Sequence, residues 1–440
     1  MIFINAKDIF YINNKIVLVN YLTGACDIIN NHIEDCISHN EFSSLDSSIL
    51  NKLINRKYIF SSVTDYNFFI EKINKKLMIE KERQYPNFLI IPTYKCNLSC
   101  PYCFENTYKK NKSKQDNSEW VENIFYKIDS INESFVKRNN MIYDPSKIEV
   151  TLMGGEPLLS KSKKDIEKII NHINERKYTY NIITNGVCID EYIELLKNIK
   201  PTYIQITLDG TKEYHDKRRC FKDGNGTFDK IMNNIDILTG NKINVSIRLN
   251  LDKNNLNNLK DYINFIEEKF KNNKYVYPYL YPIQDGGCAY NNNIGEEIEY
   301  IKKVNSISKE LNIKKFHFIF HGNQFIECVK NNKPIRFKSY NCSAQNNQYI
   351  FDFKGDIYKC WFGVGNNKYA ISANNSMNYS IDKTWKSRTI YNLKECSDCK
   401  YRYLCGGGCV NKLLAQDKDI NHPNCKNYYI LIKEQLKGII

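Results

Sequence analysis

The sequence contains no apolar stretch long enough to cross a membrane. Asp8 interrupts the region where a signal peptide would need a longer apolar core, and the last residues contain no prenylation box. No solenoid-type repeat is present, and no nucleic-acid motif with interleaved aromatic residues accompanies the basic stretches. We therefore expect a cytoplasmic globular protein with no membrane or nucleic-acid partner.

The composition of the 440-residue chain is that of an ordinary globular protein, with 42% hydrophobic and 25% charged residues. This length predicts two or three domains with a sizeable core. The formal net charge of +14 suits an acidic partner, but a solvated basic surface would give the same value.

The sixteen cysteines are the most informative residues. In a reducing compartment they favour metal or cluster ligation over disulfides. Three lie between Cys96 and Cys103, and seven lie between Cys342 and Cys425. Cys26 and Cys36 fit buried small hydrophobic residues better than ligands.

The first cysteine group has the spacing C-x3-C-x2-C, formed by Cys96, Cys100 and Cys103, and directly follows the apolar run Phe88–Tyr94. We interpret it as a loop at a strand end that wraps one iron–sulfur cluster. Three thiolates would hold three of the four irons and leave the fourth open to a substrate or cofactor. Such a cluster would perform chemistry rather than brace the fold.

The chain divides into three regions. Residues 1–86 combine short strands with expected helices at Asp27–Ser38 and Leu45–Arg56, which predicts a winged-helix-like module. Residues 301–440 hold a bridging region and the second cysteine group. Residues 87–300 alternate strands and helices, which predicts an α/β fold with a partial six-stranded (β/α)6 barrel. Its expected strands are Phe88–Tyr94, Ile148–Met153, Tyr178–Ile183, Tyr203–Leu208, Asn244–Leu249 and Tyr275–Tyr281.

The cysteine loop followed by βα units resembles the radical S-adenosylmethionine (radical SAM) superfamily. Further motifs at strand ends carry the same resemblance: Tyr102 before the third cysteine, Gly154-Gly155-Glu156-Pro157, Thr184-Asn185-Gly186, Thr207-Leu208-Asp209-Gly210, and His215-Asp216 with Arg219. Three cysteines alone would leave a zinc site open, but the ordered motifs favour the radical SAM interpretation.

The resemblance implies a 4Fe-4S cluster on Cys96, Cys100 and Cys103 and a bound S-adenosyl-L-methionine, whose reductive cleavage gives a 5′-deoxyadenosyl radical. The implied cofactor-binding residues are Tyr102 near the adenine, Gly154, Gly155, Glu156, Asn185, Thr207, Asp209, Arg219 and Arg248. Gly154 and Gly155 permit close backbone approach, and Glu156 offers an anion for the methionine ammonium. Arg219 and Arg248 compete for the methionine carboxylate, and a turn role for Asp209 fits equally well.

The second cysteine group resembles the SPASM extension of the superfamily, which carries two auxiliary 4Fe-4S clusters. A zinc ribbon would explain Cys396-x2-Cys399 alone, but not seven cysteines in this order. The resemblance implies an outer cluster on Cys396, Cys399, Cys405 and Cys425 and an inner cluster on Cys342, Cys360 and Cys409. No extra cysteine lies between Cys342 and Cys360, so the inner cluster has an open iron or a ligand such as Cys328 or Cys288.

SPASM enzymes modify peptides and proteins, and two branches compete. In the sulfatase-maturing branch, which forms formylglycine, an aspartate base follows the cysteine that corresponds to Cys360, but this chain has Trp361. The module at residues 1–86 resembles the leader-recognition domain of ribosomal-peptide maturases.

We therefore expect a peptide maturase that forms thioether cross-links, as in sactipeptides and ranthipeptides. Its expected partners are a precursor peptide with an acidic leader and an electron donor such as ferredoxin or flavodoxin. Sulfatase maturation, and carbon–carbon cross-linking or epimerisation of a peptide, are the alternatives.

Overall fold

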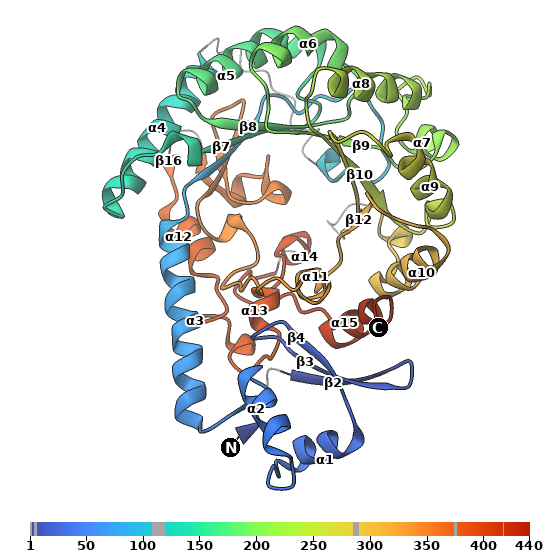
Figure 1. Cartoon of the computed structure of the whole chain (residues 1–440). Helices are drawn as coiled ribbons and strands as arrows, with labels where there is room; N and C mark the ends of the chain where they lie inside the picture. Colours follow the sequence, from blue (N-terminus) through green and yellow to red (C-terminus); the bar gives the residue numbers. More distant parts are fainter. Residues whose placement is uncertain (1, 4–6, 108–118, 285–289, 374–375, 417) are drawn as a thin grey trace.

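The computed structural model of the chain describes residues 2–3, 7–107, 119–284, 290–373, 376–416 and 418–440 (Figure 1). The centre of the fold is a curved parallel sheet whose strands pair in sequence order. All six strands expected from the sequence form, so the partial barrel is confirmed. They are β6 (Asn87–Ile91), β7 (Glu149–Leu152), β8 (Thr179–Thr184), β9 (Ile204–Thr207), β10 (Val245–Leu251) and β11 (Val276–Pro282).

Helices cover the outside of this sheet and surround it as an arc (Figure 1). They are α4 (Trp120–Arg138), α5 (Lys163–Glu175), α6 (Ile189–Asn198), α7 (Lys212–Arg218), α8 (Phe228–Gly240) and α9 (Leu259–Lys269). Helix α5 buries one stripe, Ile166, Ile169, Ile170 and Ile173, at helical spacing. Strand residues such as Val150 and Leu152 are fully buried in the same core. Because the strands are parallel, the loops after their carboxyl ends meet at one mouth.

The sheet does not end with the barrel strands. Strand β13 (Gln348–Asp352) pairs in parallel with β6, and β14 (Ile357–Tyr358), β15 (Ala370–Ala373) and β16 (Ser376–Met377) continue it antiparallel. On the opposite edge, β12 (His317–Phe318) extends it next to β11. The second cysteine region is therefore hydrogen-bonded directly to the strand that carries the first cysteine loop.

The N-terminal region forms a small sheet with helices beside it. Strands β2 (Lys7–Ile12), β3 (Lys15–Asn20) and β4 (Ala25–Ile29) are antiparallel, and β1 (Ile2–Phe3) pairs with β5 (Ile59–Phe60). The helices are α1 (Asn31–His39), α2 (Ser47–Asn55) and the long α3 (Val63–Arg83), which leads into β6.

The expected helix over Asp27–Ser38 is wrong at its start, because residues 27–29 belong to β4. A turn at Gly24, with φ of 75°, sends the chain back along β3 and pairs Asp27 with Leu18. The helix begins only after Asn30, whose side chain accepts a hydrogen bond from the backbone N–H of Ile33 at 2.9 Å. Helical spacing of the apolar residues did not reveal this hairpin.

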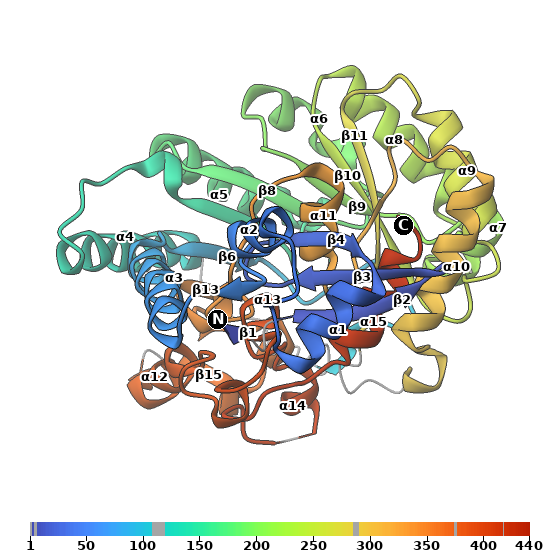
Figure 2. The same ribbon diagram turned by 60° about the horizontal axis from the view of Figure 1, so that its bottom comes forward.

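The N-terminal sheet packs on the C-terminal helix α15 (Tyr428–Leu436), as Figure 2 shows from below. The rings of Phe10 and Tyr429 are 4.9 Å apart. Asp8 accepts hydrogen bonds from Tyr21 at 2.7 Å and Tyr401 at 2.6 Å, and pairs with Lys400. The N-terminal sheet and the C-terminal region thus meet at an interface that contains both aromatic packing and buried polar contacts.

The remaining α-helices of the described residues follow β11 and lie before or within the second cysteine region. They are α10 (Glu297–Glu310), α11 (Asn323–Asn331), α12 (Tyr379–Ser387), α13 (Arg402–Cys405) and α14 (Asn411–Ala415). In the part of the chain that the structure describes, no helix combines the length and apolar character needed to cross a membrane.

Candidate functional site

The first cysteine loop follows β6 at the mouth of the barrel. The backbone N–H of Ser99 donates to the carbonyl of Cys220 at 3.1 Å, and Leu98 forms an isolated bridge with Phe221. All three thiols, on Cys96, Cys100 and Cys103, are partly buried. The segment after α7 thus holds the loop over the strand ends.

Gly154 and Gly155 press the loop after β7 against this cysteine loop. A Cβ on Gly155 would lie 2.2 Å from the carbonyl oxygen of Lys95, and one on Gly154 would lie 2.4 Å from the side chain of Ile91. Both residues have positive φ, 105° for Gly154 and 51° for Gly155. The backbone N–H of Glu156 also donates to the carbonyl of Lys95 at 2.8 Å. Only glycine fits these two positions.

The buried carboxylate of Glu156 joins the ends of β7 and β8. It accepts hydrogen bonds from the hydroxyl of Thr184 at 2.6 Å and from the backbone N–H groups of Asn185 and Leu158 at 2.7 and 2.9 Å. Burial raises the pKa of Glu156, and these donors oppose the rise. Three of about four lone-pair directions are therefore filled by the protein itself.

Asn185 contacts the cysteine loop directly. Its amide donates to Asn97 at 2.7 Å and lies 3.9 Å from the sulfur of Cys96. Thr207 is buried at the end of β9, where it pairs in register with Arg248 on β10. Strand-end polar residues from β8, β9 and β10 thus surround the mouth.

Tyr102 is held in a charged network at the ends of β9 and β10. Its hydroxyl donates to Asp209 and accepts from Arg219 at 2.7 Å. The guanidinium of Arg218 lies 5.0 Å from the centre of the Tyr102 ring and pairs with Asp252 at 2.9 Å. Sequence reasoning missed Arg218 and Asp252, although Arg218 directly precedes Arg219.

The two arginine candidates differ in their surroundings. Arg219 is buried, and within the described residues its Nε makes no hydrogen bond. Burial lowers its pKa, but nearby Cys100 and Tyr102 raise it above the ordinary value. Arg248 instead donates from Nε to Asn250 at 2.8 Å and lies over the ring of Tyr281. An unpaired buried donor next to Cys100 is suited to an anionic group.

The second cysteine region contains two thiol groups. Cys342, Cys360 and Cys409 form one, which we name the inner set; burial raises the pKa of Cys342 to about 11, and Cys409 adds to the rise. Burial also raises the pKa of Cys360, and Cys409 and Cys342 add to the rise.

Four further cysteines form what we name the outer set. In this set, burial raises the pKa of Cys396 to about 12, and the nearby thiols of Cys405, Cys399 and Cys425 add to the rise. The assignment of these two sets as ligands of auxiliary clusters stays a prediction.

A loop of three glycines, Gly406 to Gly408, connects the two sets, because it joins Cys405 to Cys409. All three have positive φ, and a Cβ on Gly408 would lie 2.1 Å from the carbonyl oxygen of Asn424. Arg388 fills the space inside the loop and donates to the carbonyls of Gly407 and Gly408, both at 2.9 Å. Sequence reasoning missed Arg388, which has no motif around it.

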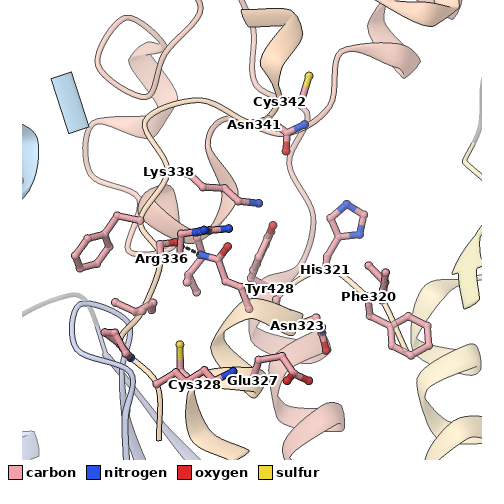
Figure 3. Close-up of a pocket in the computed structure, with 18 of the residues that line it drawn as sticks. Phe320, His321, Asn323, Glu327, Cys328, Arg336, Lys338, Asn341, Cys342 and Tyr428 are labelled. Atoms are coloured by element: carbon pink, nitrogen blue, oxygen red, sulfur yellow. Dashed lines mark hydrogen bonds between the residues drawn. The ribbon is translucent and has the colours of Figure 1, made fainter. Parts of the chain in front are cut away.

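A pocket of about 1180 Å³ opens beside the inner set, between β11, α11 and α3 (Figure 3). Cys342 lies at one end and Cys328 at the other, with Lys338, His321 and Tyr428 between them (Figure 3). Cys328 packs against Gly24, whose added Cβ would lie 3.2 Å away. The structure therefore does not bring Cys328 to the inner set, and Cys288 lies outside the described residues.

All described cysteines are free thiols. Across the ranges that the structure describes, no three His, Cys, Asp or Glu side chains are arranged to hold a single metal ion.

Comparisons with known proteins agree with this geometry. Residues 90–266 match the family described as the radical SAM superfamily. The cysteine-type anaerobic sulfatase-maturating enzyme of Clostridium novyi (strain NT) is 26% identical over 349 residues, which cover 76% of this chain and 88% of that protein. The radical SAM cyclopropyl synthase TigE of Paramaledivibacter caminithermalis is 24% identical over 434 residues, covering 91% of this chain and 85% of TigE.

A solved structure resembles nearly the whole chain. Streptococcus suis SuiB bound to its precursor peptide SuiA has a TM-score of 0.55 and 15% identity, covering 96% of this chain and 99% of SuiB. SuiB has also been solved with S-adenosylmethionine, again with a TM-score of 0.55. At this identity the likeness concerns the fold. The match over residues 90–266 identifies a radical SAM domain in this chain, and its sequence relatives include a sulfatase-maturating enzyme and a cyclopropyl synthase.

Proposed function

We propose that this radical SAM enzyme matures a precursor peptide by forming thioether cross-links between a cysteine sulfur and a carbon of another residue. The observation that carries the proposal is the combination of a barrel mouth, two further thiol sets and an N-terminal sheet in one chain. SuiB, whose fold is similar over 96% of this chain, was solved with a precursor peptide. We take residues 1–86 as the leader-binding module, 87–300 as the barrel and 301–440 as the auxiliary-cluster region.

Cys96, Cys100 and Cys103 would hold the 4Fe-4S cluster of the barrel, and Arg219 would hold the carboxylate of S-adenosylmethionine. The unpaired Nε of Arg219, buried beside Cys100, supports the second assignment over Arg248. The bound pair supplies the hydrogen-abstracting chemistry of the family. The last lone-pair direction of Glu156 is available to the methionine ammonium.

The remaining cofactor-binding residues would shape this site. Gly154 and Gly155 keep the loop after β7 close to the cysteine loop. Asn185, Thr207, Asp209 and Tyr102 would line the space at the strand ends, with Tyr102 and Asp209 fixed by their mutual hydrogen bond. A rigid polar rim would orient the cofactor and exclude water.

The inner and outer thiol sets would hold two auxiliary 4Fe-4S clusters. Three thiols in the inner set would leave one iron open to the cysteine sulfur of the peptide. Cys425 of the outer set is exposed, and the charged residues Lys394 and Lys426 flank the set in sequence. An acidic electron carrier such as ferredoxin or flavodoxin would suit that surface.

The precursor's leader would add a strand to β4. Strand β2 packs on α15 through Phe10 and Tyr429, and β4 forms the other edge of this sheet, where Ile28 is 60% exposed. An exposed apolar residue on an edge strand is what an added strand would cover. The pocket of about 1180 Å³ beside Cys342 would then receive the residues to be modified.

Two observations favour other chemistries. TigE, which matches 91% of this chain, is a cyclopropyl synthase, so carbon–carbon bond formation is the second candidate. A sulfatase-maturating enzyme matches 76% of the chain. Trp361, at the position after Cys360, carries no basic group, which argues against the aspartate-dependent sulfatase chemistry.

Co-expression with each small peptide encoded near the gene tests the proposal. A thioether removes two hydrogens per cysteine, so the peptide should lose two mass units per link, and the linked cysteine should resist alkylation. The same mass loss with a free, alkylatable cysteine would favour carbon–carbon bond formation. Oxidation of a co-expressed sulfatase, with every peptide mass unchanged, would refute the peptide-maturase proposal.

A further inference from the structure

The pocket beside the inner set contains a histidine held by a carboxylate. Nδ1 of His321 lies 2.7 Å from one oxygen of Glu297, and the backbone N–H of His321 donates to the other oxygen at 2.6 Å. Glu297 is the first residue of α10, and His321 follows β12. Both side chains line the pocket. Two hydrogen bonds from one residue fix the position of the carboxylate and the ring.

This contact determines which ring nitrogen can act as a base. A carboxylate only accepts hydrogen bonds, so Nδ1 of His321 carries the proton that is shared with Glu297. The neutral ring then has its lone pair on Nε2. In the portion of the chain that is described, Nε2 makes no hydrogen bond or ion pair.

The ring faces the part of the pocket next to the inner set. In Figure 3 the imidazole lies to the right of Tyr428 and points toward the side of the pocket where Asn341 and Cys342 lie. The rings of His321 and Tyr428 are 6.3 Å apart and nearly perpendicular. Lys338 lines the same space, and its positive charge would stabilise a thiolate formed there.

The proposed thioether chemistry needs such a group. A peptide thiol must lose its proton before its sulfur can bond to iron or carbon, because the thiolate is the reactive form. Trp361, directly after Cys360, supplies no base. Among the described residues that line the pocket, His321 is the histidine.

We propose that His321, oriented by Glu297, is the general base that deprotonates the substrate cysteine in this pocket. The inference rests on the proposed function and adds a catalytic residue to it. The overall change is balanced. The thiol S–H bond breaks and its proton goes to Nε2 of His321. The carbon C–H bond breaks and its hydrogen atom goes to the adenosyl radical. The C–S bond forms, and the remaining electron goes to an oxidised iron–sulfur cluster.

The test compares His321→Gln and Glu297→Gln with a matched control, His317→Gln, four residues earlier on β12 with an exposed side chain. The assay uses the anaerobic holoenzyme and the cysteine-bearing peptide encoded nearest to the gene. It measures 5′-deoxyadenosine and cross-linked peptide separately. We expect His321→Gln to form 5′-deoxyadenosine while cross-linking falls by about 100-fold or more, the usual contribution of a general base. Cross-linking by Glu297→Gln should fall less, and cross-linking by the control His317→Gln should match that of the wild type.

A second measurement does not depend on turnover. Diethyl pyrocarbonate modifies accessible imidazoles, and mass spectrometry locates the modified residue. The peptide should protect His321 in the holoenzyme but not His317, and a cysteine-to-serine peptide should protect it less.

The proposal is overturned if His321→Gln still cross-links at the wild-type rate, if both products fall in the same proportion, or if the peptide gives no protection. A wild-type enzyme that leaves the peptide mass unchanged would contradict the proposed function instead, and the protection measurement would still decide whether a peptide reaches His321.

Discussion

Replacing Arg388 by methionine should loosen the loop that joins the two thiol sets. The Arg388 side chain is 1% exposed and makes four hydrogen bonds to backbone carbonyls. Nε donates to Ile420 at 2.6 Å, Nη1 to Gly408 at 2.9 Å, and Nη2 to Gly407 and His422, both at 2.9 Å. Methionine keeps the apolar stem and removes every donor.

The size of the effect follows from these four bonds. A hydrogen bond from a charged donor contributes about 1.5–3 kcal/mol net, so four give about 6 kcal/mol at the low end. Roughly half is offset because the variant no longer has to desolvate a guanidinium and water can reach some of the carbonyls. We therefore expect local opening of the loop to become easier by about 3 kcal/mol, which is more than 100-fold in the opening equilibrium. Arg388→Lys should be intermediate, because one ammonium cannot reach all four carbonyls.

Hydrogen exchange measured by mass spectrometry reports this opening directly. The backbone N–H of Asn424 donates to Gly407 at 3.0 Å and that of Gly406 to Arg402 at 2.8 Å, so their exchange should accelerate. Iron content of the anaerobic protein should fall as both sets lose their common loop. Arg176→Met is the matched control, because Arg176 binds Asp129 on α4, away from the glycine loop. Unchanged exchange and full iron in Arg388→Met would refute the reasoning.

Two further predictions concern the barrel, and a third concerns β13 beside it. Gly155→Ala should lose iron from the first cysteine loop, because its Cβ would lie 2.2 Å from the carbonyl oxygen of Lys95. Gly224→Ala is the control, because Gly224 also has positive φ but has nothing within 4 Å of the added Cβ; it should keep its iron and cost only about 1–2 kcal/mol of strain. Equal iron contents in the two variants would contradict this prediction. Arg219→Met should weaken S-adenosylmethionine binding by about 10- to 100-fold in equilibrium dialysis, and Arg248→Met should weaken it less; the reverse order would make Arg248 the carboxylate ligand. Burial raises the pKa of Asp352 to about 6, so the folded state binds more protons than the unfolded state between about pH 4 and pH 6. The free energy of unfolding of the wild type, relative to Asp352→Asn, should fall as pH rises through that window and stay level above it; a difference independent of pH in denaturant titrations would count against the shift.

The barrel strands could be predicted because apolar residues recur at strand spacing in them. Every second residue of β10, from Val245 to Leu251, is buried, and turns separate each strand from the next helix. The motifs at strand ends were visible for the same reason, since each directly follows an apolar run. The hairpin at Gly24 was missed because Asp27 to Ile29 carry no alternation that distinguishes a strand from a helix start.

The contacts that hold the site could not be predicted from the sequence. Arg388 lies 17 residues before Cys405, and only the folded chain brings its guanidinium inside the glycine loop. His321 and Glu297 come from two different elements and match no short motif. Arg218 was visible beside Arg219, but its ion pair with Asp252 depends on how α7 packs at the end of β10. Long-range contacts of buried polar groups depend on tertiary structure, which local patterns do not encode.

A row of aromatic rings connects the N-terminal sheet to the pocket. Tyr21 and Tyr401 are 5.1 Å apart, Tyr401 and Tyr428 are 5.6 Å apart and stacked, and Tyr428 meets His321 at 6.3 Å. Rings packed at these distances are well ordered, so the sheet cannot move far relative to the pocket without breaking them. The separation between a leader bound at β4 and His321 is therefore fixed by the fold. In the proposed function, this packing sets the number of peptide residues between the leader and the modified cysteine. The N-terminal module therefore helps to determine which cysteine of the peptide reaches His321.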